Sequence, residues 1–258
     1  MLEIIQGDNI DILSSFSDES FRMIYTDPPF NTGNKQTREN LSLESTFSYD
    51  DKFSDYKSFL YPRIKEAKRL LKKDGSFFLH LDWREVHYAK IWCDEIFGRK
   101  CFQNHIIWAF DYGGRSKRKY SAKHNDILWY SKSPKNYVFH YDQIKRIPYL
   151  APGLVGPEKA KKGKTITDVI WQTIVPTNSK ENLKYPTQKP IGLLSQFIKV
   201  HTDPKDMLLD FFAGSGSLGQ AANDLGRDCV LIDNNPQAIE TMKKRFADAH
   251  HIFWQHQK

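Results

Sequence analysis

The sequence predicts an α/β protein with a doubly wound, mostly parallel β-sheet. Apolar segments of strand length alternate with segments of helical period through most of the chain. A glycine-rich loop at 213–219 directly follows the apolar run MLLDFF, as in nucleotide-binding βα units. Only the short stretch 234–258 follows Asp233, which ends the next apolar run, so strands from the N-terminal half must complete this sheet. The pattern therefore predicts a Rossmann-like sheet built from both ends of the chain.

The first predicted elements are short. Residues 2–6 and 22–25 are apolar and predict two buried strands, with a short helix at 9–15 between them. Residues 55–75 carry apolar side chains at helical spacing, and Gly75 is the predicted stop of that helix.

The middle of the chain continues this alternation and then loses it. It predicts a strand at 76–82, an amphipathic helix at 84–98, and strands at 104–110 and 125–131. Residues 142–185 are rich in Lys, Pro and Gly and have little periodicity, so this stretch is predicted to leave the main sheet.

The last third returns to regular elements. A helix is predicted at 189–202, with Pro190 near its first turn, and the strand at 207–212 follows. The glycine loop then opens a helix, and the run CVLI at 229–232 leads through an acidic turn to a final helix.

Composition excludes several classes of protein. The longest apolar runs are far shorter than the roughly 20 residues that a helix needs to cross a bilayer, and the N-terminus has no basic region of a secretory signal. Cys93, Cys101 and Cys229 are odd in number and widely spaced, so neither a disulfide framework nor a zinc site is indicated. We expect a cytoplasmic protein without membrane contact, with reduced, buried thiols and no metal site.

Positive charge is concentrated in one segment. The chain has a net charge of +7, but residues 115–164 contain 13 Lys and Arg against three acids, whereas the rest has a net charge of −3. Aromatic residues are interleaved with these cations, which suits a polyanion that offers phosphates and flat bases. A solvated surface loop is the alternative interpretation. We treat residues 1–258 as one domain that carries a basic insertion at about 112–182.

The glycines of the loop have a spacing associated with nucleotides. Gly214, Gly216 and Gly219 match G-x-G-x-x-G, and Asp233 ends the strand that follows, where such folds place an acid for ribose hydroxyls. A nicotinamide-dependent dehydrogenase would begin with this loop, whereas here the loop lies near the C-terminus. Its position disfavours that class, and a plain tight turn is the alternative without a ligand.

Two acidic residues follow the N-terminal strands. Asp8 follows the strand at 2–6, and Asp27 follows the strand at 22–25. Loops at the carboxyl ends of parallel strands face one ligand-binding cleft, so both acids are expected beside the glycine loop. An ordinary helix-capping role is the alternative for Asp8.

Three motifs, TDPPF, YPTQKP and DFFAGSGS, resemble those of S-adenosylmethionine-dependent amino-group DNA methyltransferases of the permuted beta class. In that class the D-P-P-[YF] motif precedes the target-recognition region, and the glycine loop comes last. The resemblance covers nearly the whole chain. It implies a Rossmann-like fold in permuted order, S-adenosyl-L-methionine as cofactor and duplex DNA as substrate.

The resemblance implies a catalytic role for Asp27, Pro28, Pro29 and Phe30. The exocyclic amine of a base is a poor nucleophile because its lone pair is delocalised into the ring. The Asp27 carboxylate and the Pro28 carbonyl would accept its two N–H bonds and so expose the lone pair to a sulfonium methyl group. Phe30, where the family more often has Tyr, would stack on a base taken out of the duplex.

The resemblance also implies the residues that bind the cofactor. Asp233 would bind the ribose of the cofactor, Asp8 would lie by its adenine amine, and Thr187 to Lys189 would lie beside its carboxylate. Tyr185 stands where the family usually has His. The complete set is Asp8, Thr187, Gln188, Lys189, Asp210, Phe212, Ala213, Gly214, Ser215, Gly216, Asp233 and Asn234.

The DNA contacts are expected among the cations of the basic segment, most of them to phosphates. His124 lies in a segment that the family has near the target base, and a buried structural role is its alternative. The predicted DNA-binding cations are Arg115, Lys117, Arg118, Lys119, Lys159, Lys161 and Lys162.

The resemblance implies a bacterial, nucleoid-associated enzyme of a restriction-modification or epigenetic system. Members with D-P-P mostly modify adenine N6 and members with S-P-P mostly cytosine N4, so adenine is favoured and cytosine is the alternative. The family admits a homodimer and a restriction endonuclease partner, neither of which the sequence encodes visibly. An RNA or protein methyltransferase, a nicotinamide dehydrogenase and a non-catalytic DNA-binding subunit are the other hypotheses.

Overall fold

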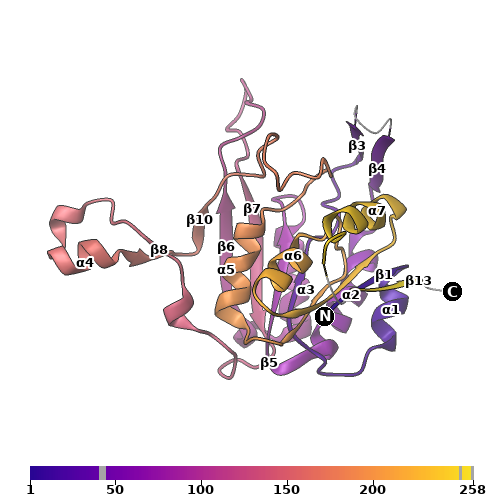
Figure 1. Ribbon diagram of the computed structural model, residues 1–258, viewed down its shortest axis with the longest axis horizontal. Coiled ribbons are helices and arrows are strands. Elements are labelled where there is room, and N and C mark those ends of the chain that lie inside the picture. Colours follow the sequence, from indigo (N-terminus) through magenta and orange to yellow (C-terminus); the bar gives the residue numbers. More distant parts are fainter. Residues whose placement is uncertain (41–44, 250–251, 257–258) are drawn as a thin grey trace.

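A central β-sheet with helices on both faces forms the body of the computed structural model (Figure 1). The structure describes residues 1–40, 45–249 and 252–256. The strands of this sheet are β1 (Leu2–Gln6), β2 (Phe21–Thr26), β5 (Leu71–Leu81), β6 (Phe102–Ala109), β7 (His124–Ser131), β10 (Val169–Trp171), β11 (Met207–Asp210), β12 (Asp228–Asp233) and β13 (Ile252–His256).

The strand order is β10-β6-β7-β5-β2-β11-β12-β1-β13. All neighbouring strands are parallel except that β7 is antiparallel to both β5 and β6. The prediction that N-terminal strands complete the glycine-loop sheet is confirmed. Strand β1 pairs with β12, with Gln6 opposite Asp233, and β2 pairs with β11, with Met23 opposite Leu208.

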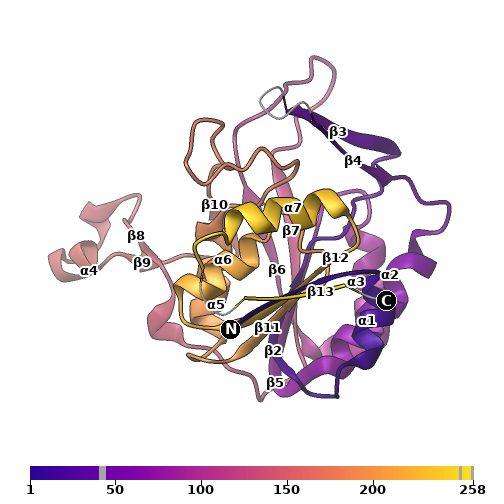
Figure 2. The ribbon, with the colours of Figure 1, turned by 45° about the vertical axis from the view of Figure 1, so that its right-hand side comes forward.

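Each face of the sheet has its own hydrophobic core. Successive residues of a strand point to opposite faces, so Met23 packs in one core and Ile24 in the other. Helices α1 (Asn9–Ser15), α2 (Tyr56–Leu70) and α3 (Val86–Phe97) cover the Ile24 side, while α5 (Ile191–His201), α6 (Ser217–Asp224) and α7 (Pro236–Arg245) cover the Met23 side, as Figure 2 shows. This arrangement agrees with the predicted fold class.

The predicted helix at 55–75 is shorter than expected. It ends at Leu70, and Leu71 already begins β5. A Cβ on Gly75 would lie 2.8 Å from the carbonyl oxygen of Arg22, so Gly75 allows β5 to approach β2 closely. The glycine that predicted a helix stop therefore serves strand packing.

Two regions outside the main sheet each contain a pair of antiparallel strands. Strands β3 (Asn34–Asn40) and β4 (Ser45–Asp51) form one antiparallel pair after β2. The segment predicted to leave the sheet does so as a lateral arm, residues 141–166, which projects to the left in Figure 1. The prediction is wrong for Val169–Trp171, because these residues return to the sheet as β10. The arm contains β8 (Arg146–Ile147), β9 (Lys164–Thr165), α4 (Pro157–Lys162) and the 3₁₀ turns Tyr141–Gln143 and Pro152–Leu154, and a further 3₁₀ turn at Arg99–Cys101 follows α3.

Cys93, Cys101 and Cys229 are buried and free, as predicted. Within the described residues, no helix combines the length and the apolar character that crossing a membrane would require.

Candidate active site

A cavity of about 400 Å³ lies at the carboxyl edge of the sheet. Because β1, β2, β11 and β12 run in the same direction, the segments that follow them meet at this edge. The predicted catalytic motif and most of the predicted cofactor residues line this one cavity. Its lining includes Asp8, Asp27, Pro28, Pro29, Phe30, Thr187, Gln188, Lys189, Asp210, Phe212, Ala213, Gly214, Ser215, Asp233 and Asn234.

The glycine loop is shaped by the acid at the end of β12. The backbone N–H of Gly214 donates to Oδ2 of Asp233 at 2.8 Å, and the N–H of Asn235 donates to Oδ1 at 2.8 Å. Gly214 and Gly216 have φ angles of +51° and +74°, which favour glycine. A Cβ on Gly214 would lie 3.2 Å from the Tyr185 ring, so this aromatic residue closes against the loop.

The third glycine has a structural role. A Cβ on Gly219 would lie 2.6 Å from Leu231 of β12, so its absence lets α6 pack closely on the sheet. Gly216 similarly lies under α7, against Met242 and Phe246. Gly216 does not itself line the cavity, although the resemblance placed it with the cofactor residues.

The carboxylate of Asp27 is paired on one side only. Lys189 donates to its Oδ2 and also donates to the carbonyl of Thr187 at 3.0 Å. Among the described residues, none donates to Oδ1 of Asp27, which is buried. Burial raises the pKa of Asp27 above its usual value, although the nearby Lys189 ammonium acts in the opposite direction.

The backbone after Asp27 is held from both sides. Tyr56 of α2 donates its hydroxyl to the carbonyl of Pro29. Asn31, with a φ angle of +55°, donates its N–H to Asp51 at 2.7 Å and its side-chain amide to Glu85 at 2.7 Å. In the described part of the chain no group donates to the carbonyl of Pro28. The turn therefore presents an unpaired carbonyl beside an unpaired carboxylate oxygen.

Asp8 both caps a helix and lines the cavity. Its Oδ1 accepts from the N–H of Ile10 at 3.1 Å as the N-cap of α1, so the capping interpretation is confirmed. Arg63 of α2 donates to the same oxygen at 3.0 Å and to Asn9 at 2.6 Å. The sequence did not single out Arg63. The only indication of it was a single cation among the apolar positions of an amphipathic helix.

Asp210 adds another buried acid. Its Oδ1 accepts from the N–H of Phe212 at 3.0 Å. Burial, and then the nearby charge of Asp27, raise the pKa of Asp210 well above its usual value. A cavity lined by three carboxyl groups with little exposure, those of Asp27, Asp210 and Asp233, suits a ligand with positively charged groups.

These residues fit S-adenosylmethionine, which has cationic sulfonium and ammonium groups. The glycine backbone at the loop leaves space that a Cβ would fill, and Asp233 is at the position expected for a ribose partner. The carboxyl groups of the lining would face these two cations, and a bound cation would favour their ionised form against the effect of burial on their pKa values. The site can thus bind the cofactor next to an acid with one oxygen open.

A family model described as DNA methylase matches residues 21–244, which span the TDPPF turn, the glycine loop and α7 almost to its end. The chain belongs to the DNA methylase family. It is thus an S-adenosylmethionine-dependent DNA methyltransferase of the kind that modifies amino groups, at N6 or N4 of a base.

Curated relatives cover most of the methyltransferase. It is 30% identical over 261 residues to the DNA adenine methyltransferase YhdJ of Escherichia coli K12, which corresponds to 96% of this chain and 83% of the relative. It is 29% identical over 245 residues to the type II methyltransferase M.HpaI of Haemophilus parainfluenzae, or 94% of this chain and 73% of the relative.

Solved structures share the fold. A complex of M1.HpyAVI with S-adenosylmethionine matches with a TM-score of 0.66 and 24% identity, covering 95% of this chain and 99% of that one. The cytosine-N4-specific PvuII DNA methyltransferase matches with a TM-score of 0.71 and 20% identity, covering 96% and 87%.

A second cavity of about 190 Å³ adjoins the first and shares Phe30, Tyr185 and Lys189 with it. Its other lining residues include Trp108, Phe110 and Asn125. The methyltransferase therefore has a second compartment beside the TDPPF turn, lined by aromatic and by polar side chains, and Phe30 lines both cavities.

Phe30 rests on a residue that the sequence did not single out. Its ring stacks on His80 of β5, with 5.9 Å between ring centroids and 26° between planes. His80 is fully buried within the apolar run FFLHL. The sequence signal that could have identified it was one polar residue inside an apolar run. His124, by contrast, is exposed at the start of β7, so the alternative of a buried role is wrong for it.

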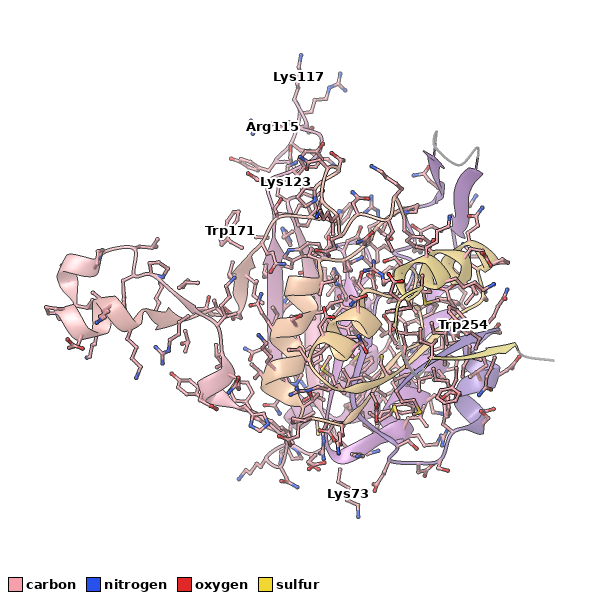
Figure 3. All side chains as sticks on the ribbon, viewed as in Figure 1. Lys73, Arg115, Lys117, Lys123, Trp171 and Trp254 are labelled. Carbon is pink, nitrogen blue, oxygen red and sulfur yellow. The ribbon has the colours of Figure 1, made fainter. Side chains whose placement is uncertain are left out.

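The seven predicted DNA-binding cations are exposed but fall into two groups. Arg115, Lys117, Arg118 and Lys119 lie in the loop from β6 to β7, which leaves the carboxyl edge of the sheet; Figure 3 labels Arg115 and Lys117 at its tip. Lys159, Lys161 and Lys162 lie on α4 in the lateral arm. The structure does not bring the two groups together (Figure 1).

Proposed function

We propose that the methyltransferase modifies N6 of an adenine that is extruded from duplex DNA. The observation that carries this proposal is the pair of open acceptors, Oδ1 of Asp27 and the carbonyl of Pro28, beside the ring of Phe30. An exocyclic amine has two N–H bonds to donate, and a flipped base needs a flat surface on which to stack. The two acceptors and the aromatic ring meet both needs.

The bound cofactor supplies an electrophilic methyl group on its sulfonium. Asp27 and Pro28 accept the two amine hydrogens and hold the nitrogen lone pair away from conjugation with the ring. As the carbon–nitrogen bond forms and the carbon–sulfur bond breaks, the nitrogen loses one proton. Oδ1 of Asp27 is the acceptor for this proton, and the raised pKa of this buried carboxyl suits that role.

Adenine is favoured over cytosine by the D-P-P sequence and by the relative named as a DNA adenine methyltransferase. The structural likeness to a cytosine-N4-specific enzyme keeps N4 of cytosine as the second candidate. The test uses genomic DNA, methyl-labelled cofactor and digestion to nucleosides. Label in N6-methyladenine is expected; label only in N4-methylcytosine would overturn the adenine assignment.

The domain proposal is one catalytic domain, 1–258, in permuted motif order, with a DNA-recognition insertion at about 112–182. The loop and the arm would contact phosphates with Arg115, Lys117, Arg118, Lys119, Lys159, Lys161 and Lys162. Several relatives are named type II methyltransferases, which supports a restriction-modification system with an endonuclease of the same specificity. Sequencing of methylated DNA identifies the site, and an endonuclease blocked by that methylation would support the pairing.

A further inference from the structure

A buried hydrogen-bonded chain links the two cavities. Tyr25 lines the larger cavity and its hydroxyl is hydrogen-bonded to Nδ1 of His80. Asn125 lines the smaller cavity, and its Nδ2 donates to Nε2 of His80 at 3.0 Å. The imidazole of His80 lies between them and is inaccessible to solvent.

The imidazole is held in one orientation by aromatic rings. Phe30 stacks on it, and Trp108 meets it edge-on at 5.5 Å between centroids and 88° between planes. Burial, and then the charge of Lys189, lower the pKa of His80 well below its usual value, so the ring is neutral. A neutral imidazole has one donor and one acceptor nitrogen.

The two hydrogen bonds of the ring fit one neutral tautomer. With Nδ2 of Asn125 as the donor to Nε2, the ring hydrogen is on Nδ1 and faces the oxygen of Tyr25. The carboxamide of Asn125 cannot exchange its oxygen and nitrogen positions without losing its bond to His80, unless the tautomer changes as well. Among the described residues no second acceptor binds the other Nδ2 hydrogen of Asn125, and this side chain lines the smaller cavity.

We propose that Asn125 reads the target base by donating this hydrogen to the ring nitrogen beside the reacting amine, with His80 as its positioning residue. This inference rests on the proposed function. Adenine N1 and cytosine N3 are unprotonated acceptors next to the amino-bearing carbon, whereas guanine and thymine carry an N–H at the corresponding position. A fixed donor therefore accepts adenine and cytosine and repels guanine and thymine.

The test compares an oligonucleotide that carries the mapped site with one that has 1-deazaadenine, in which C–H replaces N1, at the methylated position. For wild type, kcat/KM is expected to fall about tenfold more between these substrates than for Asn125→Ala, which has no donor to N1 in either case. Equal falls in both proteins would overturn the proposal. If cytosine is the methylated base, 3-deazacytosine replaces the adenine analogue.

Three comparisons sharpen this test. Substitution by 7-deazaadenine, which retains N1, is expected to affect wild type and Asn125→Ala equally. Asn182→Ala alters another Asn of the same cavity and is expected to keep the wild-type response to 1-deazaadenine. His80→Phe retains a ring under Phe30 and is expected to lose the response, as Asn125→Ala does; a full response would remove His80 from the positioning role.

Failure of the two proposals can be told apart. If wild type transfers no methyl group to the unmodified oligonucleotide, the proposed function fails. If wild type is active and both proteins respond alike to 1-deazaadenine, only the assignment of Asn125 fails.

Discussion

Lys189 is hydrogen-bonded to the carboxylate of Asp27 across 162 positions of sequence, with only 7% and 15% of their side chains exposed. The motif YPTQKP thus delivers a cation to the acid of the motif TDPPF. A base amine that approaches Asp27 meets one oxygen that is already occupied by Lys189 and one that is open. In the proposed mechanism, the ammonium occupies Oδ2 and leaves Oδ1 of Asp27 for the substrate.

Replacement of Asp27 by Ala should remove catalysis and leave cofactor binding. Activity is expected to fall about a thousandfold or more, because the amine loses both an acceptor and a base. S-adenosylhomocysteine should still raise the melting temperature, since the glycine loop and Asp233 are unchanged. Asp18→Ala, at an exposed ion pair with Arg69, is the matched control and should retain activity.

The pairing of Asp27 and Lys189 should be visible in stability. Asp27→Ala leaves a buried ammonium without its partner and is expected to cost about 3 kcal/mol in the free energy of unfolding. Adding Lys189→Met should recover most of that loss in urea denaturation. Additive losses would contradict a coupled pair. The exposed pair Lys243 and Glu240 serves as control, with a coupling below about 1 kcal/mol.

Two glycines of the loop should respond differently to Ala. Gly214→Ala puts a Cβ against Tyr185 at a positive φ, so it should weaken binding of S-adenosylhomocysteine in calorimetry. Gly219→Ala forces a Cβ against Leu231 and should instead cost about 2 kcal/mol of stability. Gly114→Ala, with open space around it, should change neither quantity.

The basic loop should act through the salt dependence of DNA binding. Removing Arg115, Lys117 and Arg118 together is expected to lower the slope of log affinity against log salt by about 0.9 for each phosphate that the protein no longer neutralises. Lys73→Ala is the control, because Figure 3 shows this side chain far from the loop, below the sheet. An unchanged slope in the triple variant would exclude the loop from the DNA interface.

His201 should make stability depend on pH. Burial lowers its pKa to about 3, so at mildly acidic pH the unfolded chain binds a proton that the folded chain does not. The contribution of neutral His201 to the free energy of unfolding is therefore fully present above pH 6.5 and falls as the pH drops towards 3. The stability difference between wild type and His201→Gln should shift against wild type by about 2 kcal/mol between pH 6.5 and 5. Carboxyl groups elsewhere titrate alike in both proteins, so their contributions cancel in this comparison of wild type with His201→Gln.

The sheet could be predicted from sequence because local signals indicated its strands, whereas the catalytic role of the TDPPF turn rests on the family resemblance and stays a prediction. Apolar runs defined the strands, and the position of the glycine loop required β1 and β2 as neighbours of β12 and β11. The predicted end of α2 was wrong because Gly75 is needed for the close approach of its strand to Arg22 in another strand, and not for the end of a helix. A helix stop and a close strand approach look alike in sequence.

Side-chain partners across the fold could not be predicted in the same way. Lys189 was assigned to the cofactor by its motif, but nothing local indicates its pairing with Asp27. His80 and Asn125 lie in different strands and become partners only when β5 and β7 are antiparallel neighbours. The hairpin of β3 and β4 also had no distinct turn signal.

Strand β1 lies between β12 and β13, both of which come from the C-terminal end of the chain. During synthesis on a ribosome, this first strand is therefore made long before either of its neighbours exists. Asp27 likewise leaves the ribosome well ahead of Gly214, with most of the chain between them. Until β12 and β13 have been synthesised, both edges of β1 are unpaired and can pair wrongly. Folding is slow when segments that are distant in sequence must meet. The edge of the sheet that carries both Asp27 and Gly214 therefore forms only after β11 and β12 have been synthesised.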